Sequence, residues 1–253
     1  MSTVYLVGAG PGASDLLTLR AVRLLEAADI VFHDALINPE TLRLAARALL
    51  VPVGKRSGRY ATAQRFINKQ LVDAARRYPV VVRLKGGDPM LFGRASEEIS
   101  FLKKKNIRVE VVPGVTAALA AGAELGISLT QRLVARSVVF ATPRTAEGAR
   151  PSGWEKAIAN ADTAVLYMAA GEAQEVKDAL IGAGLRRETP LVIAENVSLP
   201  SSAAFAGTLD DLAKLAARLN GGPAVIVLGE VCAELAVSTA SSTPISPKAL
   251  TAL

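Results

Sequence analysis

The sequence is poor in the residues that build several common kinds of functional site. Its 253 residues include one cysteine and one histidine, which excludes a disulfide framework and leaves too few ligands for a His/Cys zinc site. Aromatic residues make up only 4%, whereas single-stranded nucleic-acid binders rely on aromatic stacking platforms. No apolar run reaches the roughly 18–20 residues of a membrane span, and no export signal is visible. We therefore expect no metal, no nucleic-acid or membrane partner, and a cytoplasmic location.

The remaining composition is that of a globular protein with one large or two medium domains. Hydrophobic residues make up 51% and charged residues 21%, and 29 basic against 23 acidic side chains give a net charge of +6. The charge is uneven: residues 1–112 hold 18 basic and 10 acidic side chains, and residues 113–253 hold 11 and 13. Residues 51–83 carry eight basic side chains against Asp73 alone. Such a stretch indicates an anionic partner or a solvated helix face, and composition leaves both open.

The first part of the chain alternates short apolar runs with amphipathic stretches, which predicts a parallel α/β sheet. Strands are expected at residues 4–7, 30–32, 50–53, 80–84 and 108–112. Helices are expected at residues 16–25 with Ser14 as N-cap, and at 41–50, 64–77 and 96–105.

Pro113-Gly114 interrupts this alternation and marks a domain boundary. An alanine-rich helix is expected at residues 116–125, strands at 137–141, 164–168, 190–195 and 224–228, and helices at 176–183 and 209–219. We therefore predict an N-terminal α/β domain over residues 1–113, a C-terminal α/β domain over 114–235, and a flexible Ser/Thr/Ala/Pro-rich tail over 236–253.

Two glycine-rich loops follow predicted strands. Residues 8–13, GAGPGA, match the dinucleotide-binding pattern G-x-G-x-x-G/A, with Asp34 at the end of the next strand. Pro11 argues against a bound pyrophosphate because it offers no N–H group. The second loop, Lys85-Gly86-Gly87-Asp88-Pro89, has two glycines that allow a backbone to approach a ligand closely.

Five blocks of sequence occur in order between residues 3 and 231. They are residues 4–12 with 17–19; 54–56 with Gln64 and 67–68; 81–89 followed by 92–94; 113–118; and 126–130 with Arg132. Together they resemble the tetrapyrrole methylases, and the blocks at 54–56 and 92–98 look most like the branch that methylates uroporphyrinogen III.

The resemblance implies a fold and a reaction. It implies two α/β domains of the tetrapyrrole methylase type, assembled as a homodimer. The first domain would lie on the substrate side and the second on the cofactor side of an active-site cleft between them. S-adenosylmethionine would donate two methyl groups to carbons of uroporphyrinogen III, a tetrapyrrole polyanion, to give precorrin-2 through precorrin-1, and S-adenosylhomocysteine would leave. The product would serve siroheme or cobalamin-type synthesis. A small polyanion of this kind suits the basic half of the chain.

The resemblance also assigns residues, here by their numbers in this chain. Asp34, Lys55 and Glu97 would be catalytic, with Asp34 or Glu97 as the carboxylate that stabilises or deprotonates the methylated ring. Substrate binding would fall to Arg94 and Arg132. Cofactor contacts would fall to Pro11, Gly86, Gly87, Asp88, Leu91, Thr116, Ala117, Met168 and Val197, the last at a position where the family usually has glycine.

Other functions remain open at this point. A later precorrin methyltransferase or a ribosomal-RNA ribose methyltransferase would share the fold. A nicotinamide-dependent reductase would use residues 8–13 with Asp34, and a non-catalytic anion-binding protein would use the basic face. Cys232 is expected to be inert, because nothing near it in the sequence would lower the pKa of its thiol.

Overall fold

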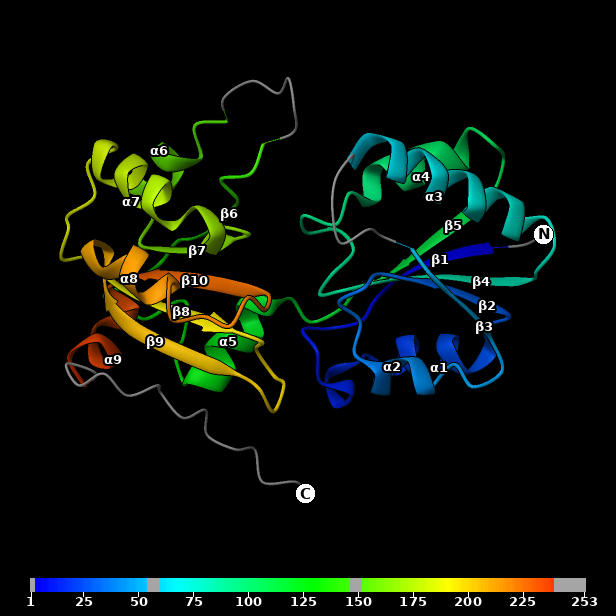
Figure 1. The fold of residues 1–253 in the computed structure, drawn as a ribbon, viewed down its shortest axis with the longest axis horizontal. Helices are drawn as coiled ribbons and strands as arrows, with labels where there is room; N and C mark the ends of the chain where they lie inside the picture. The colour runs from blue at the N-terminus through cyan, green and yellow to red at the C-terminus, as the bar shows by residue number, and fades with distance from the viewer. Residues whose placement is uncertain (1–2, 54–59, 146–151, 239–253) are drawn as a thin grey trace. The chain divides into compact units, whose positions relative to one another are not determined.

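The computed structural model describes residues 3–53, 60–145 and 152–238 of the chain. It divides into two compact units, Met1–Thr116 and Ala117–Leu253, which we call the first and the second unit (Figure 1). The predicted boundary after residue 113 lies just before this division. The substrate and cofactor sides assigned to the two domains, and the cleft between them, stay predictions.

The first unit is built on a five-stranded parallel sheet. Its strands are β1 (Thr3–Gly8), β2 (Ile30–His33), β3 (Leu49–Pro52), β4 (Val80–Lys85) and β5 (Arg108–Val112), in the spatial order β3-β2-β4-β1-β5. The central strands read as continuous apolar runs because helices cover both faces of a parallel sheet. The predicted parallel α/β sheet is confirmed, and each of its five strands falls within a residue or two of its expected place.

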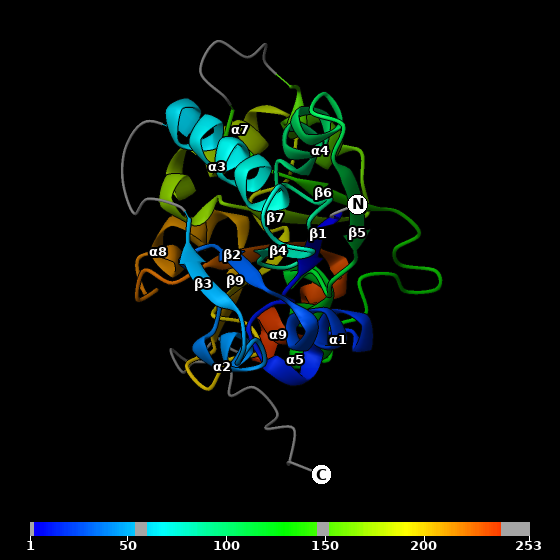
Figure 2. The same ribbon diagram turned by 90° about the vertical axis from the view of Figure 1, so that its right-hand side faces the viewer.

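Two pairs of helices cover the two faces of this sheet. Helices α1 (Leu19–Ala27) and α2 (Pro39–Arg43) pack on one face, and α3 (Tyr60–Ala75) and α4 (Ala95–Lys103) on the other. Both Figure 1 and Figure 2 show the pairs on opposite sides of the strands. Each face has its own hydrophobic core, one around Leu25 and Leu84 and one around Leu71 and Leu102.

The loop after β1 differs from the sequence prediction. Ser14 begins a short 3₁₀ turn, Ser14–Leu16, and caps no α-helix. The α-helix begins at Leu19, and Thr18 is its N-cap because its side chain accepts the Ala21 N–H. The Ser14 prediction was wrong, and the α-helix starts later after the glycine loop than expected.

The second unit is built on a mixed five-stranded sheet. Its strands are β6 (Val138–Ala141), β7 (Thr163–Tyr167), β8 (Pro190–Glu195), β9 (Ala203–Thr208) and β10 (Ala224–Gly229), in the order β6-β7-β10-β8-β9. Only β6 and β7 pair in parallel, and the other pairings are antiparallel. Strand β9 was not expected, because its small residues show weak alternation.

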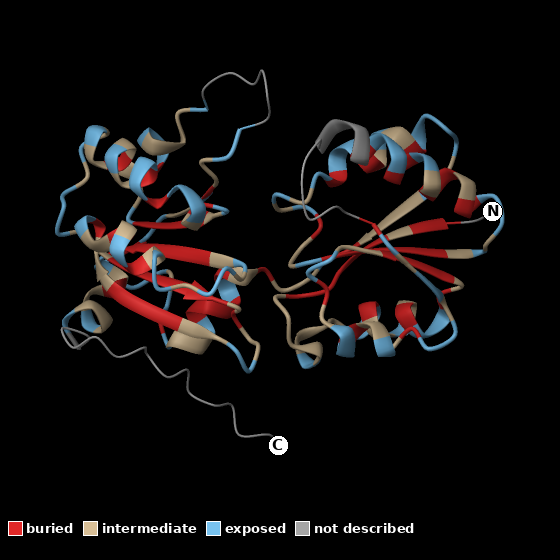
Figure 3. Cartoon of the chain, viewed as in Figure 1, coloured by how far each residue is buried: buried red, intermediate tan, exposed pale blue. Residues whose placement is uncertain are grey.

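Among the described residues, five α-helices surround this second sheet: α5 (Ala117–Leu125), α6 (Trp154–Ala159), α7 (Ala173–Gly182), α8 (Leu212–Ala216) and α9 (Ala233–Ser238). The buried residues lie mainly on the strands and the inward helix faces (Figure 3). Helix α6 was not expected, and α9 includes the first residues of the predicted tail, whose remainder lies outside the described residues. No described helix combines the length and hydropathy needed to cross a membrane.

Candidate functional site

Three glycine turns of the first unit meet where β1, β4 and β5 end. The Gly10 N–H donates to the Gly87 carbonyl (3.2 Å) and the Gly87 N–H donates to the Gly10 carbonyl (2.7 Å). A Cβ on Gly8 would lie 2.6 Å from the Gly114 nitrogen and 2.7 Å from the Gly87 oxygen. Only residues without a side chain allow this approach. We call Gly8, Gly10, Gly86, Gly87 and Gly114 the glycine junction.

The junction disfavours the dinucleotide interpretation of residues 8–13. The Ala9 N–H donates to the Lys85 carbonyl (2.8 Å) and the Gly10 N–H is used by Gly87, while Pro11 has none. A pyrophosphate needs free N–H groups at the start of the following helix, and here the α-helix begins only at Leu19. The two glycine-rich loops that the sequence presented separately are hydrogen-bonded to each other in one junction.

One edge of the junction is open. A Cβ built on Gly86 would meet no heavy atom within 4 Å, and Gly86 is exposed. Gly87 has a φ of +63°, a backbone conformation that glycine adopts with little strain. The Gly86 backbone is therefore the surface of the junction that a ligand can approach.

Asp88 shapes the loop that carries this open edge. Its Oδ1 accepts the Met90 N–H (2.7 Å) and its Oδ2 accepts the Gly114 N–H (3.0 Å). The Leu91 N–H closes the same turn on the Asp88 carbonyl (3.3 Å). Both carboxylate oxygens thus bind backbone, and a cofactor contact of Asp88 or Leu91 stays a prediction.

Two further predicted cofactor residues lie around the junction. Pro11 is half-buried next to Gly12, whose carbonyl accepts a hydrogen bond from the Asn38 side chain (3.0 Å). Thr116 is buried, and its Cα lies 3.9 Å from the Cβ position of Gly87. The structure thus brings Pro11 and Thr116 to the same junction from opposite ends of the first unit's sequence.

Asp34 follows β2 and is held by a buried arginine. Its Oδ1 accepts a 2.6 Å hydrogen bond from Arg83 Nη2, and its side chain is 35% exposed against 3% for Arg83. His33 lies beside it, with Nδ1 3.2 Å from the Asp34 carbonyl. Asp34 therefore has one oxygen fixed from inside the unit while part of its carboxylate reaches the surface.

Arg83 belongs to a buried group of charges that the sequence analysis did not identify as a unit. Glu98, fully buried on α4, accepts from Arg83 Nε (3.2 Å) and pairs with Lys85 Nζ (3.2 Å). Gln64 donates to the same carboxylate (3.1 Å). Burial, together with the Arg83 charge, lowers the pKa of Lys85. We call Asp34, Arg83, Lys85 and Glu98 the buried charge cluster.

Arg94 and Glu97 form an exposed pair after the glycine loop. Arg94 Nε donates to Glu97 Oε1 (2.7 Å) and Nη2 donates to Oε2 (2.8 Å). This bidentate bond raises the pKa of Arg94 and lowers the pKa of Glu97. A carboxylate so engaged is a weak base, and the choice between Asp34 and Glu97 as the reacting carboxylate stays a prediction.

The other two basic residues that the sequence analysis assigned lie elsewhere. Lys55 lies outside the described residues. Arg132 is exposed in the second unit, in a tight turn closed by hydrogen bonds between Gln131 and Ala135. The roles predicted for both residues stay predictions.

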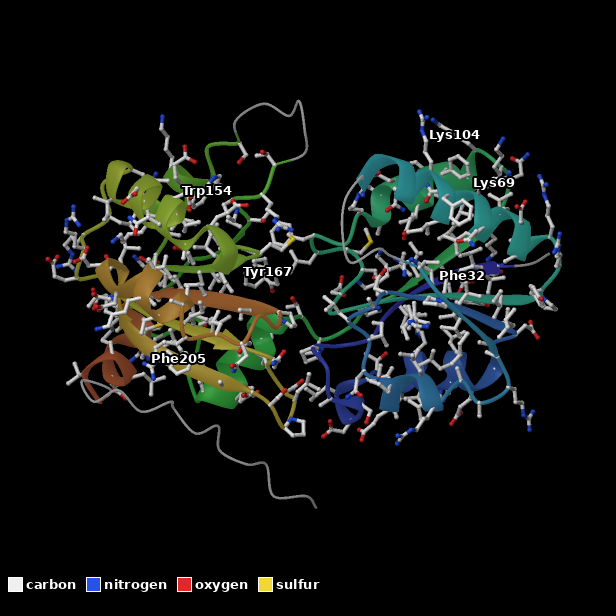
Figure 4. All side chains as sticks on the ribbon, in the orientation of Figure 1. Phe32, Lys69, Lys104, Trp154, Tyr167 and Phe205 are labelled. Atoms are coloured by element: carbon white, nitrogen blue, oxygen red, sulfur yellow. The ribbon has the colours of Figure 1, made fainter. Side chains whose placement is uncertain are left out.

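Met168 and Val197 lie on loops of the second unit with unusual backbone geometry. Met168 follows β7 with a φ of +56° and is 43% exposed. The preceding Tyr167, labelled in Figure 4, accepts the Ala118 N–H near the start of α5 (3.1 Å), next to Ala117. Non-glycine residues with a positive φ often mark functional loops.

Val197 stands where the family resemblance implies a glycine, and its backbone conformation accommodates valine. Its neighbours Asn196 and Ser198 have φ values of +52° and +71°, and Val197 itself does not. Its side chain is buried, and the Ser198 N–H is held by Glu124 (2.6 Å). A contact through the Val197 backbone therefore remains geometrically open.

Cys232 takes no part in these sites. It is buried, and burial raises the pKa of its thiol to about 12. The expected inertness of this cysteine agrees with its environment. Within the described ranges, no group of three or more His, Cys, Asp or Glu side chains is arranged to hold a metal ion.

Comparisons with known proteins extend over nearly the whole chain. Residues 3–213 match the family of Tetrapyrrole (Corrin/Porphyrin) Methylases. A uroporphyrinogen-III C-methyltransferase of Pseudomonas aeruginosa is 42% identical over 92% of this chain and 95% of its own length. A siroheme synthase of Psychrobacter cryohalolentis is 42% identical over 91% of this chain but 45% of its own. The chain thus spans about half the length of several curated relatives.

Solved structures agree with these relatives. The uroporphyrin-III C-methyl transferase of Thermus thermophilus, complexed with S-adenyl homocysteine, superposes with a TM-score of 0.80, at 38% identity and over 91% of this chain and 98% of its own. A cobalt precorrin-4 methyltransferase of cobalamin biosynthesis reaches 0.77 at 26% identity, over 91% and 95%. With the two α/β units and the glycine junction, these matches establish that the chain belongs to the tetrapyrrole methylase family.

Proposed function

We propose that this chain transfers methyl groups from S-adenosylmethionine to two ring carbons of uroporphyrinogen III, giving precorrin-2 through precorrin-1. The glycine junction carries the proposal, because it combines a rigid backbone with one open edge at Gly86. Family membership and the full-length Pseudomonas aeruginosa relative support the same reaction.

The residues of the junction fit the methyl donor. Gly86 leaves space where a side chain would otherwise stand, and Pro11 and Thr116 border the same turns. We propose that these residues hold S-adenosylmethionine together with Gly87, Asp88, Leu91, Ala117, Met168 and Val197. When bound, the donor would supply a sulfonium methyl carbon that a carbon nucleophile can attack in line, with S-adenosylhomocysteine as the leaving group.

The chain's own residues would position the substrate and balance its charge. Attack by a pyrrole carbon leaves positive charge on the ring, which a nearby carboxylate stabilises and from which it can take a proton. Asp34 is suited to this because part of its carboxylate is exposed while Arg83 fixes one oxygen. Arg94 and Arg132 would pair with carboxylates of the substrate. Lys55 would act on a proton of the substrate.

Incubation with uroporphyrinogen III and methyl-labelled S-adenosylmethionine tests the reaction directly. We expect a labelled tetrapyrrole whose mass increases by two methyl groups. Label on a precorrin but none on uroporphyrinogen III would instead support a later methyltransferase of the family, which the similarity to a cobalt precorrin-4 methyltransferase makes the second candidate.

Donor binding is tested by a pair of glycine variants. Gly86→Ala adds a methyl group that meets no protein atom, so the fold should persist while the approach of a ligand is blocked. We expect calorimetry to show weaker S-adenosylmethionine binding by Gly86→Ala. Gly182→Ala, at an equally open position on α7, is the control and should bind normally. Unchanged binding by Gly86→Ala would place the donor elsewhere.

Two further proposals concern the molecule in the cell. We propose a homodimer and a cytoplasmic location, both supported by the family resemblance. Light scattering during size-exclusion chromatography checks the first, and cell fractionation checks the second. A monomer in solution would contradict the proposed dimer.

A further inference from the structure

The buried charge cluster determines how Asp34 is held. Arg83 Nη2 donates to Asp34 Oδ1 (2.6 Å), Nε donates to Glu98 (3.2 Å), and Nη1 donates to the Leu84 carbonyl (3.0 Å). A guanidinium is a planar, rigid fork, so fixing two of its nitrogens fixes the direction of the third. The position of the Asp34 carboxylate is therefore set from within the sheet.

We propose that Arg83, anchored by Glu98, is a positioning residue that orients the Asp34 carboxylate toward the methylated ring. One oxygen, Oδ1, is held by Arg83, and Oδ2 has no hydrogen-bond partner among the described residues. This inference rests on the proposed function, since it takes Asp34 as the carboxylate that faces the reacting ring. Arg83 itself is buried, so the proposed role is exerted through Asp34.

Burial makes a purely stabilising role a poor explanation for the cluster. Arg83 and Lys85 point from a central strand into the unit, where charges lose their hydration, and well-packed apolar residues are often as stable as a buried ion pair. The cluster balances two positive against two negative groups, and Asp34 is its most exposed member. Asp34 also follows β2 at the carboxyl end of the parallel sheet, where open α/β sheets bind ligands.

Glu98 also binds a second cation, which allows the inference to be tested selectively. Its Oε2 pairs with Lys85 Nζ (3.2 Å), and Lys85 directly precedes Gly86. A change at Glu98 therefore disturbs both Asp34 and the glycine loop, whereas a change at Arg83 acts on the contact with Asp34. Arg83→Lys keeps the charge but cannot make all three bonds.

A double-mutant cycle measures whether Arg83 acts through Asp34. We expect Arg83→Lys to lower kcat about 100-fold through misplacement of Asp34, with calorimetric donor affinity unchanged. In an Asp34→Asn background the same substitution should change kcat by no more than about twofold. A further loss of about 100-fold in that background would show independent effects and overturn the inference.

Controls separate positioning from folding. Arg76→Lys, at an exposed position in the turn after α3, should leave kcat unchanged. If Arg83→Lys is unfolded by circular dichroism, Glu98→Gln replaces it, because the lost carboxylate frees Arg83. In that cycle kcat should again fall only where Asp34 is intact, although donor affinity falls as well.

A crystal structure of Arg83→Lys provides a readout that does not depend on activity. We expect the Asp34 carboxylate to leave its wild-type position, and an unchanged Asp34 would overturn the inference. If the wild type methylates no uroporphyrinogen III but Asp34 still shifts in this variant, the proposed function fails while the positioning by Arg83 stands.

Discussion

The two units use buried carboxylates in different ways. In the first unit, Glu98 binds the side-chain cations Arg83 and Lys85. In the second unit, the equally buried Glu195 accepts the backbone N–H groups of Asn220 and Gly222. A buried carboxylate therefore fixes side-chain charges in the parallel sheet and loop backbone in the mixed sheet. The first arrangement can direct a reacting group, and the second can only shape a loop.

The largest effect is expected when the ionic arrangement is broken. Glu98→Ala leaves two buried cations without their carboxylate, and the free energy of unfolding should fall by about 3–5 kcal/mol. Urea denaturation followed by circular dichroism, with hydrogen exchange of the β4 amides, measures the loss. Glu97→Ala on the exposed side of α4 is the control and should cost less than ~1 kcal/mol. Equal losses of unfolding free energy in the two variants would mean that the buried ion pairs of Glu98 add no stability beyond that of an exposed pair.

The backbone arrangement should be less sensitive. Glu195→Ala removes the acceptor from two N–H groups, for which a cost of about 1–3 kcal/mol is expected. The single tryptophan, Trp154, lies in the second unit and reports its unfolding by fluorescence. Glu188→Ala, at an exposed position, should change little. A loss of unfolding free energy as large as that of Glu98→Ala would contradict the proposed difference between the two buried carboxylates.

A half-buried carboxylate extends the comparison to the loop around Val197. Glu124 accepts the Ser198 N–H and the Ser202 hydroxyl. Because water can replace part of this contact, Glu124→Ala should cost about 0.5–1.5 kcal/mol, and weaker donor binding should accompany it. Denaturation and calorimetry measure the two effects. Glu175→Ala, exposed on α7, is the control and should change neither the free energy of unfolding nor donor binding. Full donor affinity in Glu124→Ala would show that this loop is not part of the donor site.

The smallest effect is expected at the exposed pair of Arg94 and Glu97. The Arg94 guanidinium lowers the pKa of Glu97 in the folded chain, so the pair stabilises the fold above the ordinary pKa of glutamate. That contribution, under ~1 kcal/mol, is lost as the pH falls through the lowered pKa. Thermal unfolding of wild type and Glu97→Gln should therefore differ near neutral pH and converge in acid. A difference that grows on acidification would contradict the pairing.

The sequence predicted the strands of the first unit well, because buried parallel strands read as uninterrupted apolar runs. The same pattern contained a signal for the buried charge cluster. Arg83 and Lys85 interrupt an apolar run that continues from Val80, and charges within a central strand require buried partners. Their partner Glu98 could not be named from the sequence, because it comes from a separate helix next to the equally acidic Glu97.

Other features depended on contacts between distant segments. The hydrogen bonds that join Gly10 to Gly87 link two loops that the sequence could only treat separately. Thr18 prevailed over Ser14 as the helix cap because the preceding loop forms a 3₁₀ turn first. Strand β9 carries mostly small residues, so its own sequence pattern does not indicate a strand. Its antiparallel pairing with β8 holds it in the sheet.

The chemistry of Cys232 makes this chain convenient for site-directed labelling. It is the only cysteine in the sequence, and its thiol is buried with a pKa raised to about 12. Thiol reagents act on the exposed thiolate, so the wild-type chain should resist maleimides at neutral pH. Cysteines introduced at the exposed Lys104 and Glu188, one in each unit, would then be the only sites to carry fluorophores. Energy transfer between them would follow the response of the two units to the methyl donor, with no native residue to remove first.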